Sequence, residues 1–343
     1  MQENISQMRR EVLEIPGAVE RLLTNGAADI NAAADKIRQS PPLFLTTVAR
    51  GSSDHVATYF KYASELLLGV PVASIGPSIA SIYHAKLKLR GAGCVSISQS
   101  GKSPDIVAMA KAAADQGALS LALTNDPNSP LAKVCQHTLD IHAGPEISVA
   151  ATKTFVNSAV AVMMLLARWK QDDELTKAIH ALPEQLARAN QTHWPDLRNA
   201  LTGQSSIFTL GRGPSYAMSN EAALKFKETC QIHAESYSSA EVLHGPVSIV
   251  GGGFVVLAMA ANDAAQTALI EVADNIAAKG AQVFVTSNKC SQATALEHVR
   301  TDHPLLDPIS LITSFYAMIE RLATSRGIDP DTPRHLQKVT QTR

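Results

Sequence analysis

Hydrophobic positions along the chain follow two different periods. Residues 4–24 and 27–39 repeat apolar side chains at helical spacing and predict two amphipathic helices at the start of the chain. From Leu43–Val48 onward, short apolar runs typical of buried strands alternate with Ala-rich helical segments. Because parallel strands are joined by helical crossovers, this alternation predicts an α/β fold with a largely parallel sheet.

The first half of the chain contains five predicted strands. The chain runs from LFLTTV through the turn ARGSSDH to a helix near Val56–Leu68, then through VPVASIG and GCVSIS to a helix at Asp105–Gln116. The fourth and fifth strands are ALSLALTND and TLDIHAG. Residues 170–200 are polar and helical in pattern, so they predict a connector between two halves.

The second half repeats the first. Arg50-Gly51 and Ser53 recur as Arg212-Gly213 and Ser215, 162 residues later, each pair after a β-rich run and before a helix. The strand at 94–98 matches 255–259, and DQGALSLALTN matches AAKGAQVFVTSN in nearly the same register. These coinciding registers predict a duplicated fold, although Ala-rich α/β sequences can also align by chance.

The two halves differ after the third strand, and the difference points to a ligand site. The first half has Ser98, Gln99, Ser100, Gly101, Lys102 and Ser103 where the second has Met-Ala-Ala-Asn. Ser103 suits a helix N-cap and Pro104 the first helical position, so unpaired N–H groups should face the loop. The loop predicts a phosphate cradle, and Lys102 adds either charge or a solvated side chain.

A second polar turn, Gly51-Ser52-Ser53, follows the first strand and should lie at the same sheet edge. The alternative is that SQSGKSP is an ordinary polar turn between a strand and a helix. Neither GxGxxG opening a βαβ unit nor GxxxxGK[ST] occurs, so a phosphorylated small metabolite fits better than a dinucleotide or a nucleoside triphosphate.

Charge and composition narrow the partners. Lys plus Arg number 30 against 31 for Asp plus Glu, and aromatic residues make up 5% of the chain, so neither nucleic acid nor an anionic membrane is expected to bind. Four cysteines lie far apart without a CxxC pair, and the histidines lack a ligand motif, so no metal site is expected. Without a signal or membrane segment, we expect a cytoplasmic protein.

Several unusual motifs occur in one order: SQSGKSPD, GPEISVAATKTF, a long segment from LGRGPSY to LHGPVSIV, and the ending DTPRHLQKVTQTR. They resemble the tandem SIS (sugar isomerase) domains of glucosamine-6-phosphate synthase. The stand-alone SIS-type glucosamine-6-phosphate deaminases are more similar still, because they share ARGSSDH, SSAE.LHGP and the KVTQT ending. The resemblance implies two SIS domains, each a mostly parallel sheet flanked by helices in a flavodoxin-like three-layer sandwich.

With the repeat, the resemblance gives expected domain boundaries. We expect N-terminal helices over 1–40, a first SIS domain over 41–170, a helical connector over 171–200, a second SIS domain over 201–328 and a tail over 329–343. The tail would carry an active-site lysine. Relatives are dimers, so the resemblance also implies a homodimer with shared active sites.

Glu221, Lys225 and Glu228 are spaced to share one face of a helix. By spacing alone they would be a solvated charge cluster. The resemblance instead implies that Glu228 moves a proton between C1 and C2 of an open-chain sugar, with Glu221 and Lys225 in the same pocket. It also implies that His244 opens the sugar ring and that Lys338 can form a Schiff base with a ketose.

The implied chemistry needs no metal, flavin or pyridoxal cofactor, because the sugar carbonyl accepts the electrons released at C2. Histidine titrates near neutrality and suits ring opening. Proton transfer from C2 to C1 leaves an imine, which water converts to fructose 6-phosphate and ammonia. The resemblance thus implies a deaminase of glucosamine 6-phosphate.

Two observations favour deaminase over synthase. The SIS pattern begins within about 40 residues of Met1-Gln2, too few for a glutamine-hydrolysing domain, so we expect hydrolysis of the amino sugar. Arg50 stands where synthases usually have Cys, and Ala151 where they usually have a sugar-contacting Ser, which leaves the sugar contact at Val149–Ala151 in doubt.

Other functions stay open at the level of sequence. The substrate could be galactosamine 6-phosphate or a 6-phosphorylated Amadori product, with the protein acting as a deaminase, isomerase or deglycase. A non-catalytic phosphosugar sensor is the alternative of another class. Retention of Glu228, His244 and Lys338 together favours an enzyme, since a sensor needs no proton-transfer group at C2.

Overall fold

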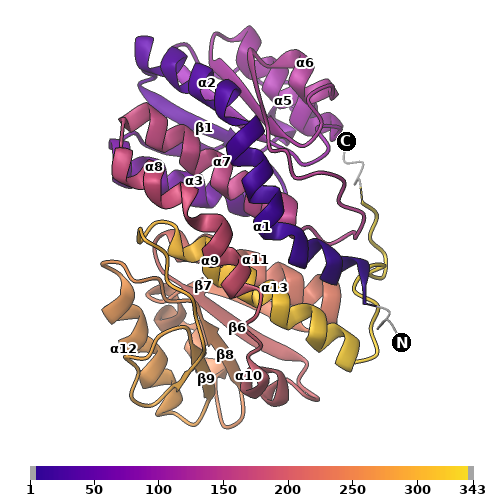
Figure 1. Ribbon diagram of the computed structural model, residues 1–343, viewed down its shortest axis with the longest axis vertical. Helices are drawn as coiled ribbons and strands as arrows, with labels where there is room; N and C mark the ends of the chain where they lie inside the picture. Colours follow the sequence, from indigo (N-terminus) through magenta and orange to yellow (C-terminus); the bar gives the residue numbers. More distant parts are fainter. Residues whose placement is uncertain (1–4, 339–343) are drawn as a thin grey trace. The chain divides into compact units, whose positions relative to one another are not determined.

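The computed structural model describes residues 5–338 (Figure 1). The chain forms two compact units that each contain one sheet. The first-sheet unit comprises residues 17–146 and 153–180, with the tail from Leu336. The second-sheet unit comprises the chain up to Pro16, residues 147–152 and residues 181–335.

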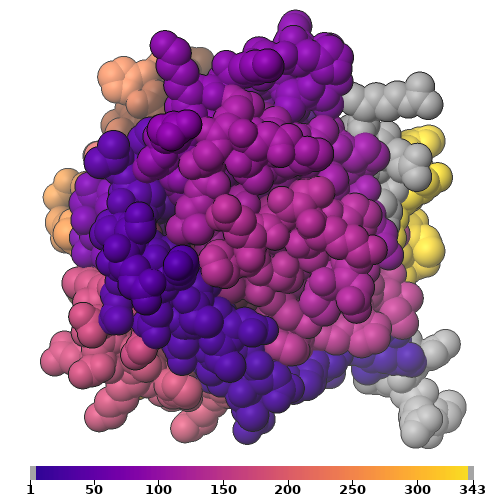
Figure 2. Space-filling view, turned by 90° about the horizontal axis from the view of Figure 1, so that it is seen from above, coloured from indigo at the N-terminus to yellow at the C-terminus, as the bar shows by residue number. Residues whose placement is uncertain are grey.

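Two helices, α1 (Gln7–Asn25) and α2 (Ala27–Gln39), open the chain as the sequence predicts. The first turn of α1 is capped from far along the chain, because the N–H groups of Gln7 and Met8 both donate to the Asp331 carboxylate at 2.7 Å. Helix α2 packs along α7 (Lys153–Lys170). In Figure 2 the indigo surface of the N-terminal segment borders magenta surface, the colour range that includes α7.

The first sheet has the strand order β2-β1-β3-β4-β5, and all its strands are parallel. Its strands are β1 (Phe44–Val48), β2 (Val72–Ser74), β3 (Ala92–Ile97), β4 (Leu119–Thr124) and β5 (His137–Asp140). The five predicted strands are therefore confirmed. In this order the chain reverses direction across the sheet between β1 and β3, which is the place where open α/β sheets bind ligands.

Helices cover both faces of the first sheet (Figure 1). They are α3 (Ser52–Leu68), α4 (Ser78–Ser81), α5 (Pro104–Asp115), α6 (Pro130–Val134), α7 and α8 (Asp173–His180). Apolar side chains of β3 and α5, among them Cys94, Ile106 and Met109, form a buried core on one face. Strand β3 is buried at every position, which explains its unbroken apolar run.

The second sheet repeats the topology of the first. Its strands are β6 (Ser206–Gly211), β7 (His233–Ser238), β8 (Val255–Ala258), β9 (Gln282–Val285) and β10 (Thr294–Ala295). Their order, β10-β9-β8-β6-β7, is the first sheet's order with β6 in the place of β1, and every pair is again parallel. Identical topologies confirm the α/β fold with two similar halves.

Helices also flank the second sheet. They are α9 (Leu182–Ala189), α10 (Pro195–Ala200), α11 (Pro214–Cys230), α12 (Gln266–Ala277) and α13 (Asp307–Ser325), with two short 3₁₀ turns, η1 (Glu241–His244) and η2 (Pro246–Ile249). Helices α11 and α13 pack together through Phe226 and Phe315, whose ring centroids lie 5.3 Å apart. Across the described part of the chain, no helix combines the length and apolar character that crossing a bilayer requires.

Candidate functional site

The turns after β1 and β3 lie at one edge of the first sheet. Parallel pairing places Val48 opposite Ser96, so both strands end side by side. After β1 the chain turns at Gly51, whose φ of +54° suits glycine, and α3 begins with Ser52 and Ser53. The predicted proximity of the two polar turns is therefore confirmed.

The loop after β3 curls on itself. The Gly101 N–H donates to the backbone carbonyl and to the hydroxyl of Ser98, both at 3.2 Å, and the Lys102 N–H donates to the Ser100 hydroxyl at 3.3 Å. The Gln99 carbonyl accepts the Asn125 N–H at 3.0 Å, which ties the loop to the end of β4. We call Ser98–Ser103 the cradle loop.

Gly101 is required by the shape of this loop. Its φ is +60°, and an added Cβ would lie 2.2 Å from the Ser129 hydroxyl oxygen and 2.5 Å from the Ser129 Cβ. Such distances are far inside van der Waals contact, so any side chain would push the loop away from α6. Glycine thus permits the tight curl of the cradle loop against Ser129.

Helix α5 begins where the sequence predicts, with Ser103 as N-cap and Pro104 at the first helical position. The Ser103 hydroxyl makes no capping hydrogen bond, and the Ile106 N–H is capped by the Asp105 carboxylate at 2.9 Å instead. The positive end of the α5 dipole still lies next to the cradle loop and favours an anion there.

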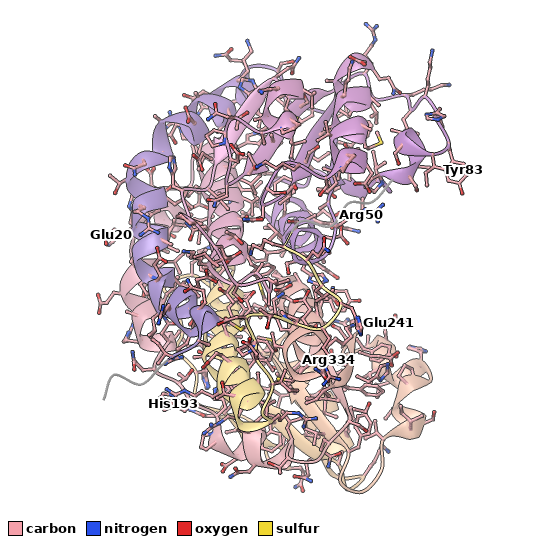
Figure 3. All side chains as sticks on the ribbon, turned by 90° about the vertical axis from the view of Figure 1, so that its right-hand side faces the viewer. Glu20, Arg50, Tyr83, His193, Glu241 and Arg334 are labelled. Carbon is pink, nitrogen blue, oxygen red and sulfur yellow. The ribbon has the colours of Figure 1, made fainter. Side chains whose placement is uncertain are left out.

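Two cations border the cradle loop. Lys102 is directed toward Asp126, with a nitrogen–oxygen distance of 3.6 Å, and its side chain is 57% exposed. Arg50, at the end of β1, donates from Nε to Asp105 in the first turn of α5 at 2.6 Å. Figure 3 labels Arg50 in the first-sheet unit.

The corresponding loop of the second half is closed by the protein itself. The Asn262 N–H donates to the Asp307 carboxylate at 2.8 Å, and Asp307 is 1% exposed. Arg300 donates to the Ala260 carbonyl at 2.8 Å and to Asp307 at 3.0 Å. The loop after β8 is therefore held by a buried carboxylate of the protein and by Arg300.

The second half contributes a buried charge cluster on α11. Lys225 Nζ lies 3.0 Å from the Glu221 carboxylate and 2.6 Å from that of Glu228. The side chains of Glu221 and Lys225 are 0% exposed, whereas Glu228 is 19% exposed. A solvated cluster on an outer helix face, the reading from spacing alone, is therefore wrong. Tyr316 of α13, a residue that no motif indicated, donates to Glu221 at 3.0 Å.

Burial and charge act in opposite directions on Lys225. Burial alone would lower the pKa of Lys225, but the carboxylates of Glu221 and Glu228 outweigh burial and raise that pKa above its ordinary value. Lys225 is therefore a fixed cation, and Glu228 is the member of the cluster that reaches the surface.

The remaining predicted residues lie elsewhere in the two units. His244 ends η1 and is exposed, just before Gly245 with φ of +140°. Val149 is half-buried, and its N–H donates to the Asp331 carbonyl at 3.4 Å. Lys338 donates to the buried Glu146 carboxylate at 3.0 Å.

Glu146 also accepts hydrogen bonds from the N–H and the hydroxyl of Thr154, at 3.1 Å and 2.6 Å. The sequence analysis missed Glu146 as the partner of Lys338. Its only signal was its position in the GPEIS segment, because the two residues are separated by 192 positions.

Comparisons with known proteins agree with this architecture. The SIS domain model matches residues 39–168 and 200–325. A glutamine–fructose-6-phosphate aminotransferase (isomerizing) from Sulfurisphaera tokodaii is 30% identical over 343 residues, which cover 96% of this chain and 56% of the relative. One from Methanothermobacter thermautotrophicus is 31% identical over 339 residues with the same coverage. The chain thus spans about half the length of these curated relatives.

Solved structures are similar over nearly the whole chain. A crystal structure from Silicibacter pomeroyi, of a protein assigned as a phosphosugar isomerase, has 64% identity and a TM-score of 0.93, covering 95% of this chain and all of that one. The C-terminal domain of glucosamine-fructose-6-phosphate aminotransferase from Francisella tularensis has 24% identity and a TM-score of 0.83, covering 97% and 100%. Glucosamine-6-phosphate deaminase from Thermotoga maritima has 19% identity and a TM-score of 0.78, covering 98% and 100%. The last two establish likeness of fold. With two matched SIS domains on two parallel sheets, the chain belongs to the SIS domain family of phosphosugar isomerases.

Proposed function

We propose that the protein deaminates and isomerises glucosamine 6-phosphate to fructose 6-phosphate and ammonia. The observation that carries the proposal is the cluster of Glu221, Lys225 and Glu228, in which a fully buried lysine holds a partly exposed carboxylate. Placing three charges in a protein interior is costly, and a purely structural helix gains little from it. A carboxylate held in a fixed orientation is what proton transfer at carbon requires.

The cradle loop is proposed to bind the phosphoryl end of the substrate. Ser98, Ser100 and Ser103 supply hydroxyls, and α5 supplies the positive end of its dipole. Gly51, Ser52 and Ser53 form the neighbouring turn, where α3 begins. A phosphate monoester offers three acceptor oxygens, which suits this set of donors.

His244 and Glu228 are proposed to carry the chemistry in turn. His244 protonates the ring oxygen and takes the C1 hydroxyl proton, which opens the ring to the aldehyde. Glu228 then removes the C2 proton, and the resulting enolamine is protonated at C1 to give an imine at C2. Water adds to that imine, and ammonia leaves as the ketone forms.

Lys225 and Glu221 are proposed as positioning residues within this scheme. The raised pKa of Lys225 keeps its ammonium charged, so it cannot accept the C2 proton at neutral pH. Its ammonium instead holds the Glu228 carboxylate in place through the 2.6 Å ion pair. Glu221 and Tyr316 fix Lys225 from the other side.

Lys338 is proposed to contact the ketose form of the substrate. Its ammonium is held in place by Glu146, and it could donate a hydrogen bond to a sugar oxygen without breaking that ion pair. A Schiff base would require Lys338 to lose a proton and leave this ion pair, because only the neutral amine attacks a carbonyl. Val149 is proposed as a neighbouring sugar contact through its backbone.

Deamination is favoured over amination because these groups need only water as a co-reactant. The curated relatives are named for glutamine-dependent amination, whereas the Thermotoga maritima neighbour is named as a deaminase. With dilute free ammonia, mass action also favours release of ammonia from the amino sugar.

One assay tests the proposal. The purified protein is incubated with glucosamine 6-phosphate, galactosamine 6-phosphate and their N-acetylated forms, and ammonia and ketose phosphate are measured separately. We expect both products in equal amounts from glucosamine 6-phosphate. If the protein binds the sugar phosphates tightly but releases ammonia from none of them, the deaminase proposal is wrong and a non-catalytic sensor is favoured.

We also propose a homodimer with shared active sites. His244 is exposed, and two apolar neighbours, Leu243 and Ile249, are 47% and 63% exposed, which suits contact with a second copy. Mixing His244→Ala chains with Glu228→Gln chains should restore part of the activity if a site takes one residue from each copy. No recovery in verified mixed dimers would exclude sharing.

A further inference from the structure

The cradle loop offers mostly neutral donors, whereas a phosphate monoester near pH 7 carries close to two negative charges. Serine hydroxyls and backbone N–H groups bring no net charge. Lys102, the one cation within the loop, is directed to Asp126. The charge that would balance a bound phosphoryl group must therefore come from a residue outside the loop, unless Lys102 moves.

Arg50 is placed to supply that charge. It lies at the end of β1, which neighbours β3, and its Nε donates to Asp105 in the first turn of α5. The Asp105 side chain is 0% exposed, whereas that of Arg50 is 46% exposed. The pair therefore presents its positive end outward at the turn where the cradle loop meets α5.

The geometry of the pair leaves the guanidinium ready for an anion. An arginine has five N–H donors in one plane, and Asp105 engages the one on Nε. Asp105 is itself fixed, because its other oxygen accepts the Ile106 N–H at 2.9 Å. Asp54, half-buried in the first turn of α3, is the other carboxylate in the field of Arg50. The terminal nitrogens of Arg50 can then bind two oxygens of one phosphoryl group.

We infer that Arg50 binds the phosphoryl group of the substrate, with Asp105 as the residue that positions its guanidinium. The inference rests on the proposed function, since that function supplies the sugar phosphate as ligand. It explains a departure noted in the sequence, where Arg50 replaces the Cys of similar synthases. In this protein the phosphoryl site combines a neutral loop with one fixed cation from the adjacent strand.

The second half provides an internal comparison. Arg212 follows β6 as Arg50 follows β1, and Gly213 has φ of +57° against +54° for Gly51. The loop after β8, however, is closed by Asp307. Arg212 therefore serves as a control of the same residue type at the equivalent position of a half without a phosphoryl site.

The test measures binding separately from turnover. Inorganic phosphate and glucitol 6-phosphate, which cannot be deaminated, are titrated calorimetrically into the wild type, Arg50→Gln, Arg50→Lys and one control variant, Arg212→Gln. Charge-assisted hydrogen bonds of this kind correspond to roughly 10- to 100-fold in affinity. We expect Arg50→Gln to weaken both ligands by about that factor, and Arg50→Lys to recover only part of it.

Kinetics and the control complete the test. For glucosamine 6-phosphate, KM should rise in Arg50→Gln while kcat changes little, and Arg212→Gln should bind within about 3-fold of the wild type. Because Arg50→Gln leaves a buried carboxylate without its cation, the double variant Arg50→Gln/Asp105→Asn provides a folded alternative.

The outcomes separate the two proposals. Unchanged phosphate affinity in both the folded Arg50→Gln protein and the double variant would overturn the role of Arg50. Weakened binding, together with no ammonia from any amino sugar in the wild type, would retain Arg50 as a phosphoryl ligand and overturn the deaminase. No binding of phosphate or glucitol 6-phosphate to the wild type would overturn both.

Discussion

The loops after the third strand of each sheet occupy the same place in the topology, but their hydrogen-bonding partners differ. In the first half, the cradle loop curls around Gly101, and its serine hydroxyls lie at the start of α5. In the second, the N–H of Asn262 is bound by Asp307, and Arg300 is bound to both the loop and Asp307. We propose that the first loop binds an external anion, whereas the second is held by a carboxylate of the protein itself.

This difference shows how a duplicated fold can divide its work. In the second half Asp307 binds the loop after β8, and helix α11 carries the buried cluster of Glu221, Lys225 and Glu228. We interpret the first half as the binding half and the second as the half that supplies proton transfer. Substitutions that affect binding, proton transfer or stability separately can test that division.

Replacing Glu228 with Gln should separate chemistry from binding. A general base contributes about 10²- to 10⁴-fold to a rate, so we expect kcat to fall by that factor. The affinity for glucitol 6-phosphate should stay within a few-fold of the wild type, because the phosphoryl group is assigned to the first half. Lys227→Gln, on the exposed side of the same helix, is the matched control and should keep full activity. A loss of affinity as large as the loss of rate would contradict the division.

Replacing Asp307 with Asn should damage the second half through stability. Asp307 accepts hydrogen bonds from Arg300, Asn262 and Thr301, and breaking a buried ion pair from one side costs about 3–5 kcal/mol. We expect the free energy of unfolding, measured in urea, to drop by that amount. A double variant with Arg300→Met should recover part of the loss. A near-neutral single variant would mean that Asp307 does not hold this loop.

Replacing Gly101 with Ala should deform the cradle loop. The added Cβ would clash with Ser129, and a strained non-glycine residue at φ of +60° adds about 1–3 kcal/mol of destabilisation. Phosphate affinity should fall as the loop moves away from α6. Asn262→Ala, at the equivalent place in the second half, should change little, because its bond to Asp307 comes from the backbone. Equal losses in the two variants would argue against distinct roles for the loops.

Acid should lower the stability of the second half slightly through Asp274. Desolvation alone would raise the pKa of Asp274, but N–H donors of Ala293, Gln292 and Ser291 outweigh it and lower the pKa to about 2. A carboxyl with a lowered pKa stabilises the fold above its ordinary pKa, and that contribution disappears as pH falls from about 4 toward 2.

Because Asp274 is only half-buried, solvent screens its interactions, and its contribution should be at most about 1 kcal/mol. Thermal unfolding of Asp274→Asn should show a lower Tm than the wild type at pH 7 and nearly the same Tm near pH 2. A difference in Tm that persists at pH 2 would assign the effect to lost packing.

The sequence predicted helices and strands correctly where local hydrophobic periodicity and capping residues determine them. Alternating strands and helices gave all five strands of the first sheet, and Ser103 and Pro104 located the start of α5. Spacing alone failed for Lys225, because a charged residue with helical periodicity has the same pattern whether a second helix covers it or not. Its burial depends on α13, which lies about 90 residues further along the chain.

Contacts between residues that are distant in sequence could not be predicted either. Lys338 was identified from the ending of the chain, but its partner Glu146 was not. Arg50 was noted only as an unusual residue, and its bond to Asp105 depends on the pairing of β1 with β3. No local pattern encodes such contacts, because they arise only when the sheet brings two strand ends together.

The cap on α1 has a consequence for the order in which a newly made chain completes its fold. The N–H groups of Gln7 and Met8 have Asp331 as their acceptor, and Asp331 is synthesised more than 300 residues later. At roughly 5–20 residues per second, residues 17–180 emerge from the ribosome about 8 to 30 seconds before that carboxylate does. The first sheet can close while translation continues, but the opening turn of the chain finds its acceptor only as synthesis nears its end.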